Sequence, residues 1–250
     1  MDNTKRFSDR VDNYDKYRPS YTNEAISYIF NEFNLSNESV IADIGSGTGI
    51  FTEKIIPNSY LVYGVEPNTE MRSIAELKLG KYRSFKSING TSDKTTIDAN
   101  SIDAITVAQA FHWFDIESTK KEFMRILKKD AYIFLIWNKR LINTPFLEAY
   151  EKILFDKIPE YKVVNHKNIS EEIIKEFLEK DYSKRTFNNN QKFDLDGVLG
   201  RLSSSSYTPK HNTDEYKEIE KEIAKTFEKY SINKTIMFNY DTEIYSGRIA

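Results

Sequence analysis

The sequence predicts an α/β fold built on a doubly wound, mostly parallel sheet. Two observations carry this prediction. From residue 36 to about residue 140, short apolar segments alternate with segments of helical periodicity, which is the pattern of parallel strands joined by right-handed crossover helices. The first apolar segment runs into an acid and closely spaced glycines, VIADIGSGTG (residues 40–49), which is typical of a turn where a ligand lies against the backbone.

The composition bounds the class of protein. A chain of 250 residues suffices for one large α/β domain with appended elements. The net charge of −2 gives no general attraction to phosphate backbones, so we expect no nucleic-acid partner. The absence of cysteine excludes disulfides and thiolate catalysis, and the three histidines lack metal-ligand spacing, so no metal site is predicted. Because no apolar run is long enough to span a membrane and the charged start is unlike a signal peptide, we expect a cytoplasmic enzyme without membrane contact.

The first 35 residues are predicted to form two helices that cover the domain. Tyr14, Tyr17 and Arg18 precede Pro19 in a polar setting, and the first helix should break there. Two interpretations remain open for this segment: its rings pack on the domain, or they close over a ligand. The second helix, from residue 22 to about 33, carries an apolar stripe that predicts core packing.

The acids on either side of the glycine turn indicate which kind of ligand-binding turn it is. Asp43 stands two residues before Gly45, and Ile50 occupies the place of the third glycine of a dinucleotide fingerprint. A second apolar run, residues 61–65, ends in Glu66, about 20 residues beyond the turn, where a carboxylate can accept both hydroxyls of a ribose. The spacing Asp-x-Gly-x-Gly-x-Gly resembles motif I of the class I S-adenosylmethionine-dependent methyltransferases. That resemblance implies S-adenosylmethionine as cofactor, S-adenosylhomocysteine as product, and Asp43 at the ammonium end of the methionine moiety.

The next segments extend the resemblance. EPNTEM (residues 66–71) resembles motif II of the family, which implies that Asn68 and Met71 lie near the ribose and adenine, although Met71 equally suits a helix core. A weak third strand over residues 85–88 precedes Thr91 and Ser92. At this place the family commonly has a small polar residue beside the adenine, while a plain turn is the alternative interpretation.

A fourth strand, residues 101–108, runs into a mixed aromatic and polar segment, which places side chains at the carboxyl edge of the sheet. AQAFHWFD (residues 108–115) resembles the segment after strand four in a small-molecule subgroup of these methyltransferases, the methyltransferase type 11-like proteins. The position predicts that Gln109, His112 and Trp113 belong to the site. His112 is the candidate general base, and a structural role is its alternative.

The remaining segments complete the sheet. A helix is expected over residues 117–129, with a lysine cluster at its end, and a fifth strand over residues 132–137. Beyond residue 143 the periodicity is mostly helical, with a sixth strand at 182–191, a short helix at 194–202 and a long helix at 213–230. Residues 235–245 alternate as in an antiparallel edge strand. The resemblance implies a seven-stranded, mostly parallel, Rossmann-like methyltransferase fold with an antiparallel edge strand and a helical C-terminal cover.

The expected organisation is a single structural domain in three parts: covering helices (1–35), a cofactor-binding α/β core (36–140), and a helical cover with the last strands (141–250). The expected function is methyl transfer to a small-molecule acceptor, with a carboxylate group as one option. The methyltransferase would act as a monomer or a homodimer. Two alternatives stay open: a protein that binds S-adenosylmethionine without turnover, and a nicotinamide-dependent oxidoreductase, against which the missing third glycine counts.

The predicted site residues fall into two groups. Those expected to bind the cofactor are Asp43, Gly45, Ser46, Gly47, Thr48, Gly49, Glu66, Asn68, Met71, Thr91, Ser92, Gln109, Tyr17 and Arg18. Those expected to bind the acceptor are His112, Trp113, Tyr14 and Arg201, the last of which lies in DLDGVLGRLSSSSYTP (residues 194–209), a segment that weakly resembles a C-terminal element of the subgroup.

Overall fold

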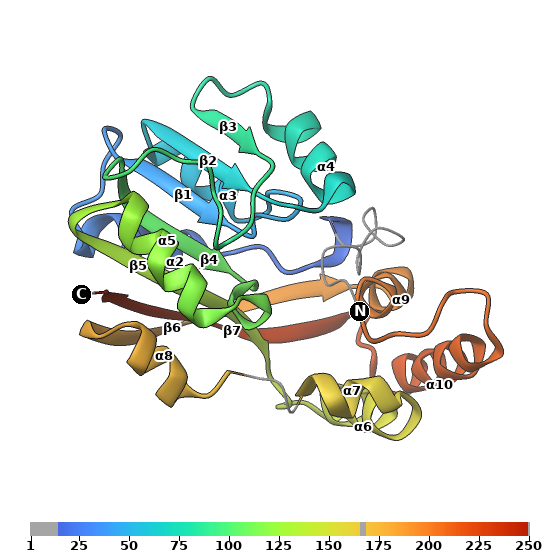
Figure 1. The fold of residues 1–250 in the computed structure, drawn as a ribbon. Coiled ribbons are helices and arrows are strands. Elements are labelled where there is room, and N and C mark those ends of the chain that lie inside the picture. Colours follow the sequence, from blue (N-terminus) through green and yellow to red (C-terminus); the bar gives the residue numbers. More distant parts are fainter. Residues whose placement is uncertain (1–14, 166–168, 250) are drawn as a thin grey trace.

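A computed structural model describes residues 15–165 and 169–249 of the chain. One seven-stranded sheet runs through it, in the order β3-β2-β1-β4-β5-β7-β6 (Figure 1). Its strands are β1 (Val40–Ile44), β2 (Leu61–Val65), β3 (Phe85–Ile88), β4 (Ile102–Ala108), β5 (Leu127–Arg140), β6 (Lys180–Phe193) and β7 (Ile236–Arg248). Strands β1 to β5 pair in parallel, and β7 pairs antiparallel with both β5 and β6.

The predicted fold class is confirmed, with one difference in detail. The antiparallel strand β7 lies one position inside the sheet, and β6 forms the outermost strand on that side. Because β7 has hydrogen-bonded neighbours on both sides, its second half can be buried almost continuously, while its first half keeps the predicted alternation.

Helices connect the strands, and seven of them begin at a polar capping residue. The helices are α2 (Asn23–Glu32), α3 (Thr52–Ile55), α4 (Thr69–Leu79), α5 (Ile116–Ile126), α6 (Pro145–Lys157), α7 (Pro159–Asn165), α8 (Glu171–Phe177), α9 (Leu195–Ser203) and α10 (Asp214–Tyr230), with short 3-10 turns η3 (Ile56–Asn58) and η4 (Phe111–Trp113). The side chains of Thr22, Asn68, Asp115, Thr144, Ser170, Asp194 and Thr213 each accept a hydrogen bond from the third residue of the helix that follows.

The two faces of the sheet are covered by different helices, as expected of a doubly wound fold. On one face, Phe123 of α5 and Phe177 of α8 join a core with the apolar residues of β4 and β5. On the other face, Ile29 of α2 and Ile55 of α3 pack with residues such as Phe134. The carboxyl ends of β1, β2 and β4 therefore form one edge between two covered faces.

A third core lies beside the sheet. Helices α6, α9 and α10 pack on the first half of β7, around residues such as Tyr150, Tyr216 and Phe238. In Figure 1 these helices gather together with α7 at one end of β6 and β7. Arg201 of α9 is buried where this core meets the sheet.

The passage from α5 to β5 differs from the prediction. The helix ends at Ile126, and Lys128 and Lys129, expected at the helix end, belong with Asp130 to the start of β5. Leu127 already pairs with Ile102 of β4, and the register then shifts before the next pair. The shift accommodates Asp130, whose φ of +62° is left-handed.

None of the helices in the described residues combines the length and apolar character needed to cross a membrane. Within the same ranges, His, Asp and Glu side chains form no cluster of three or more that could hold a metal ion.

Candidate functional site

The turn after β1 is held by the end of β2. The parallel register pairs Ile44 with Val65, so the next residues of both strands lie side by side. The backbone N–H groups of Gly45 and Ser46 donate to the Val65 carbonyl oxygen at 2.8 and 3.1 Å. The N–H of Gly47 donates to Oε2 of Glu66 at 2.9 Å. The turn is thus fixed by one carbonyl and one carboxylate of the neighbouring strand.

The three glycines of this turn have different roles, although all have left-handed φ values, +73° at Gly45, +57° at Gly47 and +80° at Gly49. A Cβ at Gly45 would lie 2.5 Å from Cβ of Ala110, and one at Gly49 would lie 2.6 Å from Cδ1 of Leu79. A Cβ at Gly47 would meet only the Met71 sulfur, at 3.8 Å. Gly45 and Gly49 therefore allow close packing, whereas Gly47 opens onto a cavity.

Asp43 lies behind this turn and does not line a cavity. Its side chain is fully buried, and its two oxygens accept hydrogen bonds from the hydroxyls of Thr52 at 2.6 Å and Thr106 at 2.9 Å. Burial raises the pKa of Asp43 from 3.8 to about 6, against the lowering effect of the two hydroxyls. Through these threonines Asp43 ties β1 to α3 and β4, and its buried side chain lies in neither wall of the two compartments described below.

Glu66 is the carboxylate at the cavity wall. Oε2 accepts from Gly47 and Oε1 accepts from the backbone N–H of Asn68 at 2.8 Å. Burial raises the pKa of Glu66, while these backbone bonds and Arg72 lower it. An ionised carboxylate has about four acceptor positions, so two remain for a ligand.

Two adjoining compartments lie along this edge of the sheet. The large one encloses about 280 Å³ and the small one about 60 Å³. The large compartment is lined by Gly45, Gly47, Glu66, Pro67, Asn68, Met71, Gly90, Thr91, Ser92, Asp93, Ala108, Gln109, Ala110, Trp113, Phe114 and Asp115. The small compartment is lined by Arg18, Pro19, Tyr21, Gly45, Ser46, Gly47, Thr48, Ile50, Phe51, Ala108, Gln109, Asn138 and Arg201. The four residues common to both walls, Gly45, Gly47, Ala108 and Gln109, mark where the compartments meet.

Most of the sequence-predicted residues are brought together at these walls. In the large compartment, Asn68 caps α4 through a 2.8 Å bond from the Met71 N–H, and Ser92 hydrogen-bonds Thr119 at 2.8 Å. Gln109 at the junction has a φ of +59°. Residues other than glycine rarely adopt this left-handed backbone conformation, and those that do are often found at functional sites. In the small compartment, Oγ1 of buried Thr48 has no hydrogen-bond partner among the described residues.

The aromatic segment after β4 lies along the large compartment. Trp113 lines that compartment with Glu66 and Met71 and is absent from the wall of the small one, and its assignment to the acceptor stays a prediction. His112 lies in neither wall, and its ring packs 4.6 Å from that of Trp113. This arrangement gives no support to His112 as a general base or as an acceptor ligand.

The N-terminal segment crosses the small compartment. Arg18 lines the wall and donates from Nη2 to the carbonyl of Ser204 at 3.0 Å. Tyr17 lies outside both walls, with its ring against α9, where a Cβ at Gly200 would lie 2.2 Å from it. Tyr17 therefore anchors the segment and Arg18 reaches the cavity. Tyr14, the other expected residue of this segment, lies outside the described residues.

Arg201 enters the small compartment from α9 with only 8% of its surface exposed. Its Nε donates to the Tyr240 hydroxyl at 3.2 Å, and Nη1 donates to the hydroxyls of Ser204 at 3.3 Å and Ser205 at 3.0 Å. Within the described part of the chain, no carboxylate forms an ion pair with this guanidinium.

Several wall residues were missed from the sequence, among them Asn138 and Tyr21 of the small compartment. Asn138 follows the apolar run of β5, and its side chain donates to the carbonyls of Pro19 and Ser20 at 3.3 and 3.2 Å. A polar residue after a buried strand is the signal that could have found Asn138. Tyr21 packs edge-on against Phe51, 4.8 Å between ring centroids, and carries no comparable signal in the sequence.

Comparisons with known proteins agree with this geometry. Residues 42–135 match the sequence family described as a methyltransferase domain. An uncharacterized methyltransferase-like protein of Schizosaccharomyces pombe is 33% identical over 156 residues, which are 60% of this chain and 58% of the relative. An uncharacterized methyltransferase of Mycobacterium tuberculosis is 32% identical over 134 residues, 54% of this chain and 52% of the relative. The chain thus spans little more than half the length of these relatives.

Solved structures show the fold. A protein of Anaeromyxobacter dehalogenans, provisionally named a type II methyltransferase, matches with a TM-score of 0.64 at 16% identity, over 93% of this chain and 98% of that one. A protein of Anabaena variabilis, provisionally named a methyltransferase of an antibiotic biosynthesis pathway, matches with a TM-score of 0.60 at 19% identity, over 90% and 97% of the two chains. The chain therefore has the Rossmann-like methyltransferase fold. The predicted resemblance to methyltransferases is confirmed over residues 42–135, which match a methyltransferase domain.

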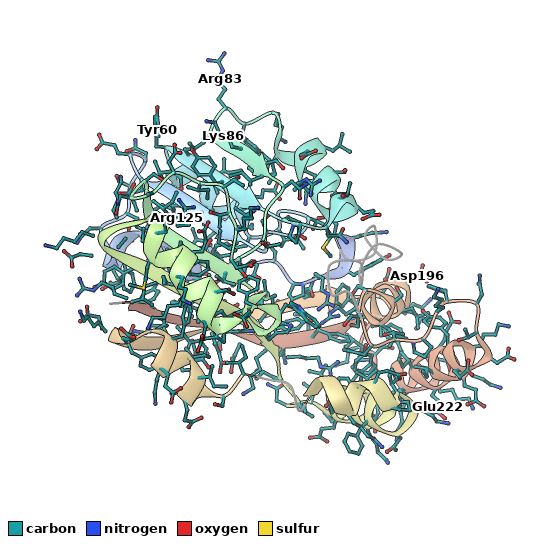
Figure 2. The ribbon with its side chains drawn as sticks, in the orientation of Figure 1. Tyr60, Arg83, Lys86, Arg125, Asp196 and Glu222 are labelled. Carbon is teal, nitrogen blue, oxygen red and sulfur yellow. The ribbon has the colours of Figure 1, made fainter. Side chains whose placement is uncertain are left out.

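The raised pKa of Asp43 predicts a pH-dependent stability. A buried acid whose folded-state pKa lies above its unfolded value stabilises the fold below pH 3.8, and this contribution is lost as the pH rises through about 6. The loss amounts to about 3 kcal/mol. Asp43→Asn removes it, so urea unfolding at pH 4 and pH 7 should show the variant gaining stability relative to the wild type at the higher pH. Asp196→Asn, at an exposed position on α9 (Figure 2), should follow the wild type. A variant-to-wild-type difference that is the same at both pH values would contradict this account of Asp43.

The glycine geometry predicts opposite defects for two neighbouring substitutions. Gly47→Ala should stay folded, with a loss of about 1 kcal/mol from the left-handed backbone, because its methyl group meets open space. It should nevertheless lose S-adenosylhomocysteine binding in calorimetry. Gly49→Ala should be the less stable variant, since its methyl group overlaps buried Leu79. Equal stability losses would contradict the difference in packing between the two glycines, and normal binding by Gly47→Ala would show that the cavity beside Gly47 is not the ligand site.

Proposed function

We propose that this protein transfers the methyl group of S-adenosylmethionine to a small-molecule acceptor that carries a carboxylate. One observation supports the cofactor above all others: Glu66 is held by the N–H groups of Gly47 and Asn68 at the wall of the cavity that Gly47 leaves open. A carboxylate with two acceptor positions left fits two ribose hydroxyls. The residues present therefore fit the cofactor that the family implies.

The large compartment suits the nucleoside. Glu66 would accept both ribose hydroxyls, and Met71, Ser92 and Trp113 would surround the adenine with a sulfur, a hydroxyl and an indole. The backbone of the turn from Gly45 to Gly47 would carry the methionine arm towards the small compartment, because these residues line both walls. Asp43 acts as a positioning residue, which holds the turn through Thr52 and Thr106.

When bound, S-adenosylmethionine supplies an electrophilic methyl group on a cationic sulfur. The residues of the protein have to align the acceptor with the methyl group and exclude water from the site. The N-terminal segment serves this purpose, since it is fixed on three sides. Asp15 pairs with Lys78 of α4 at 2.7 Å, Tyr17 packs on α9, and Asn189 of β6 donates to the Ser20 carbonyl at 2.7 Å.

The charges of the small compartment support a carboxylate acceptor. Among the described residues, its wall contributes two guanidinium groups, from Arg18 and Arg201, and no acidic side chain. The cofactor brings a sulfonium and an ammonium group against one carboxylate, so its binding adds positive charge. An anionic acceptor is therefore favoured electrostatically over a cationic one, and the planar fork of a guanidinium matches a carboxylate.

The same wall supports the proposed division of the chain. Arg18 and Tyr21 come from the first 35 residues, the glycine turn and Gln109 come from the segment 36–140 with Asn138, and Arg201 comes from the segment 141–250. We propose that the central segment binds the cofactor and that the two flanking segments complete the acceptor side.

A relative from Saccharomyces cerevisiae is consistent with the proposed cofactor. It is named a probable S-adenosylmethionine-dependent methyltransferase and is 31% identical over 128 residues, which are 50% of this chain and 43% of the relative.

Calorimetry with S-adenosylmethionine, S-adenosylhomocysteine and NAD tests the proposed cofactor. The first two should bind and NAD should not. Glu66→Ala should weaken S-adenosylmethionine at least tenfold, since each hydrogen bond to a charged group contributes roughly 1.5–3 kcal/mol.

The matched control is Glu70→Ala, which removes an exposed carboxylate at the start of α4 and should bind like the wild type. Circular dichroism establishes that both variants are folded. Unchanged affinity in a folded Glu66→Ala variant would remove the cofactor assignment. Formation of S-adenosylhomocysteine on addition of a protein-free extract of cellular small molecules distinguishes an enzyme from a protein that only binds the cofactor.

A further inference from the structure

We propose that the acceptor's carboxylate is itself the methylated group, so that the product is a methyl ester. This inference rests on the proposed function and adds the atom that reacts. It starts from the ionisable side chains that the described residues contribute to the wall of the small compartment, which are Arg18, Arg201 and Tyr21. The first two are cations, and a tyrosine hydroxyl is neutral near pH 7. None of the three is a base that could take a proton from an alcohol or an ammonium group at neutral pH.

The acids near the cavity lie elsewhere. Glu66, Asp93 and Asp115 line the large compartment and are absent from the small one. Asp43 is fully buried behind the turn and bonded to Thr52 and Thr106. The small compartment is therefore suited to a nucleophile that arrives already deprotonated, and a carboxylate is such a nucleophile at neutral pH.

Arg201 is arranged to bind an anion without being neutralised by the protein. Its Nε and Nη1 donate to three neutral hydroxyls, which hold the plane of the guanidinium but carry no opposite charge. Its Nη2 forms no hydrogen bond among the described contacts, and the residue lines the cavity. A buried cation in this state is stabilised by a bound carboxylate.

The shared wall brings this anion site close to the point of reaction. Arg201 lines the small compartment, and Gly45, Gly47 and Gln109 at the boundary of that compartment also line the large one. A carboxylate held by Arg201 consequently lies near the junction where the methionine arm would turn. In the reaction, a carboxylate oxygen forms a bond to the methyl carbon while the carbon–sulfur bond breaks. The electron pair of that bond stays on sulfur, which becomes a neutral thioether, and no proton moves.

A binding experiment tests the anion site. The protein is saturated with S-adenosylhomocysteine and titrated calorimetrically with benzoate and succinate, and with benzamide and succinamide as neutral counterparts. At least one carboxylate should bind about tenfold more tightly than its amide, and Arg201→Met should abolish this difference while S-adenosylhomocysteine binds as before. Arg83→Met, which removes an arginine that projects away from the sheet at its β3 end (Figure 2), should behave like the wild type.

Three outcomes would overturn the inference at this stage. They are amides that bind as tightly as carboxylates, failure of both carboxylates to bind the loaded protein, and an Arg201→Met variant that loses S-adenosylhomocysteine together with the carboxylate. The last would assign Arg201 to the cofactor's own carboxylate. Failure of the wild-type protein to bind S-adenosylhomocysteine would instead refute the proposed function, so the two failures are distinguishable.

The product identifies the reacting atom. With methyl-labelled S-adenosylmethionine and the carboxylate that binds, the labelled product should release methanol in mild alkali, as an ester does. Turnover should be nearly constant between about pH 7 and pH 9, because no general base has to lose a proton. An alkali-stable product, a rate that rises about tenfold per pH unit, or a bound carboxylate that is never methylated would each show that the carboxylate only anchors the acceptor.

Discussion

The site depends on the parallel register between β1 and β2. This register brings the Val65 carbonyl and the Glu66 carboxylate beside the turn that follows β1, where three consecutive backbone N–H groups need acceptors. A buried N–H group without an acceptor is costly, so the turn can take its open, left-handed shape only where these oxygens stand. A shift of the register by one residue would remove the acceptors from Gly45, Ser46 and Gly47 together.

Two buried charged side chains at the site are held by hydroxyls. Asp43 is held by two threonines, and Arg201 is held by two serines and a tyrosine. Hydroxyls orient a charge without cancelling it, so the two residues keep most of the electrostatic field that an ion pair would remove. For Asp43 the consequence is a raised pKa and a rigid turn. For Arg201 the consequence is a cation that faces the cavity and can bind an anionic group.

Much of the fold could be predicted because the pattern of apolar residues within each segment indicates whether that segment forms a helix or a strand. The apolar runs of β1, β2 and β4 and the stripe of α10 are signals carried by single segments. The start of β5 could not be predicted in this way. Lys128, Lys129 and Asp130 have helix-end and turn character locally, but pairing of Leu127 with Ile102 draws them into the strand. The place of β7 between β5 and β6 likewise follows from which strands are free to pair, and not from its own alternation.

For the site, the sequence alone determined the motif residues, because the spacing of Asp43, the glycines and Glu66 reflects one strand–turn–helix unit and the tip of the next strand. Only the tertiary structure decided what each of them faces. Asp43 points inward to Thr52 and Thr106, and Gly47 is the glycine beside which a side chain would meet open space. Trp113 lines the large compartment, and His112 lies in neither wall. The tertiary structure also brought Arg18 and Arg201, far apart in the chain, to one small compartment. The physical reason is that spacing along a strand or turn fixes which residues are neighbours, whereas the direction of a side chain depends on packing and hydrogen-bond partners from distant segments.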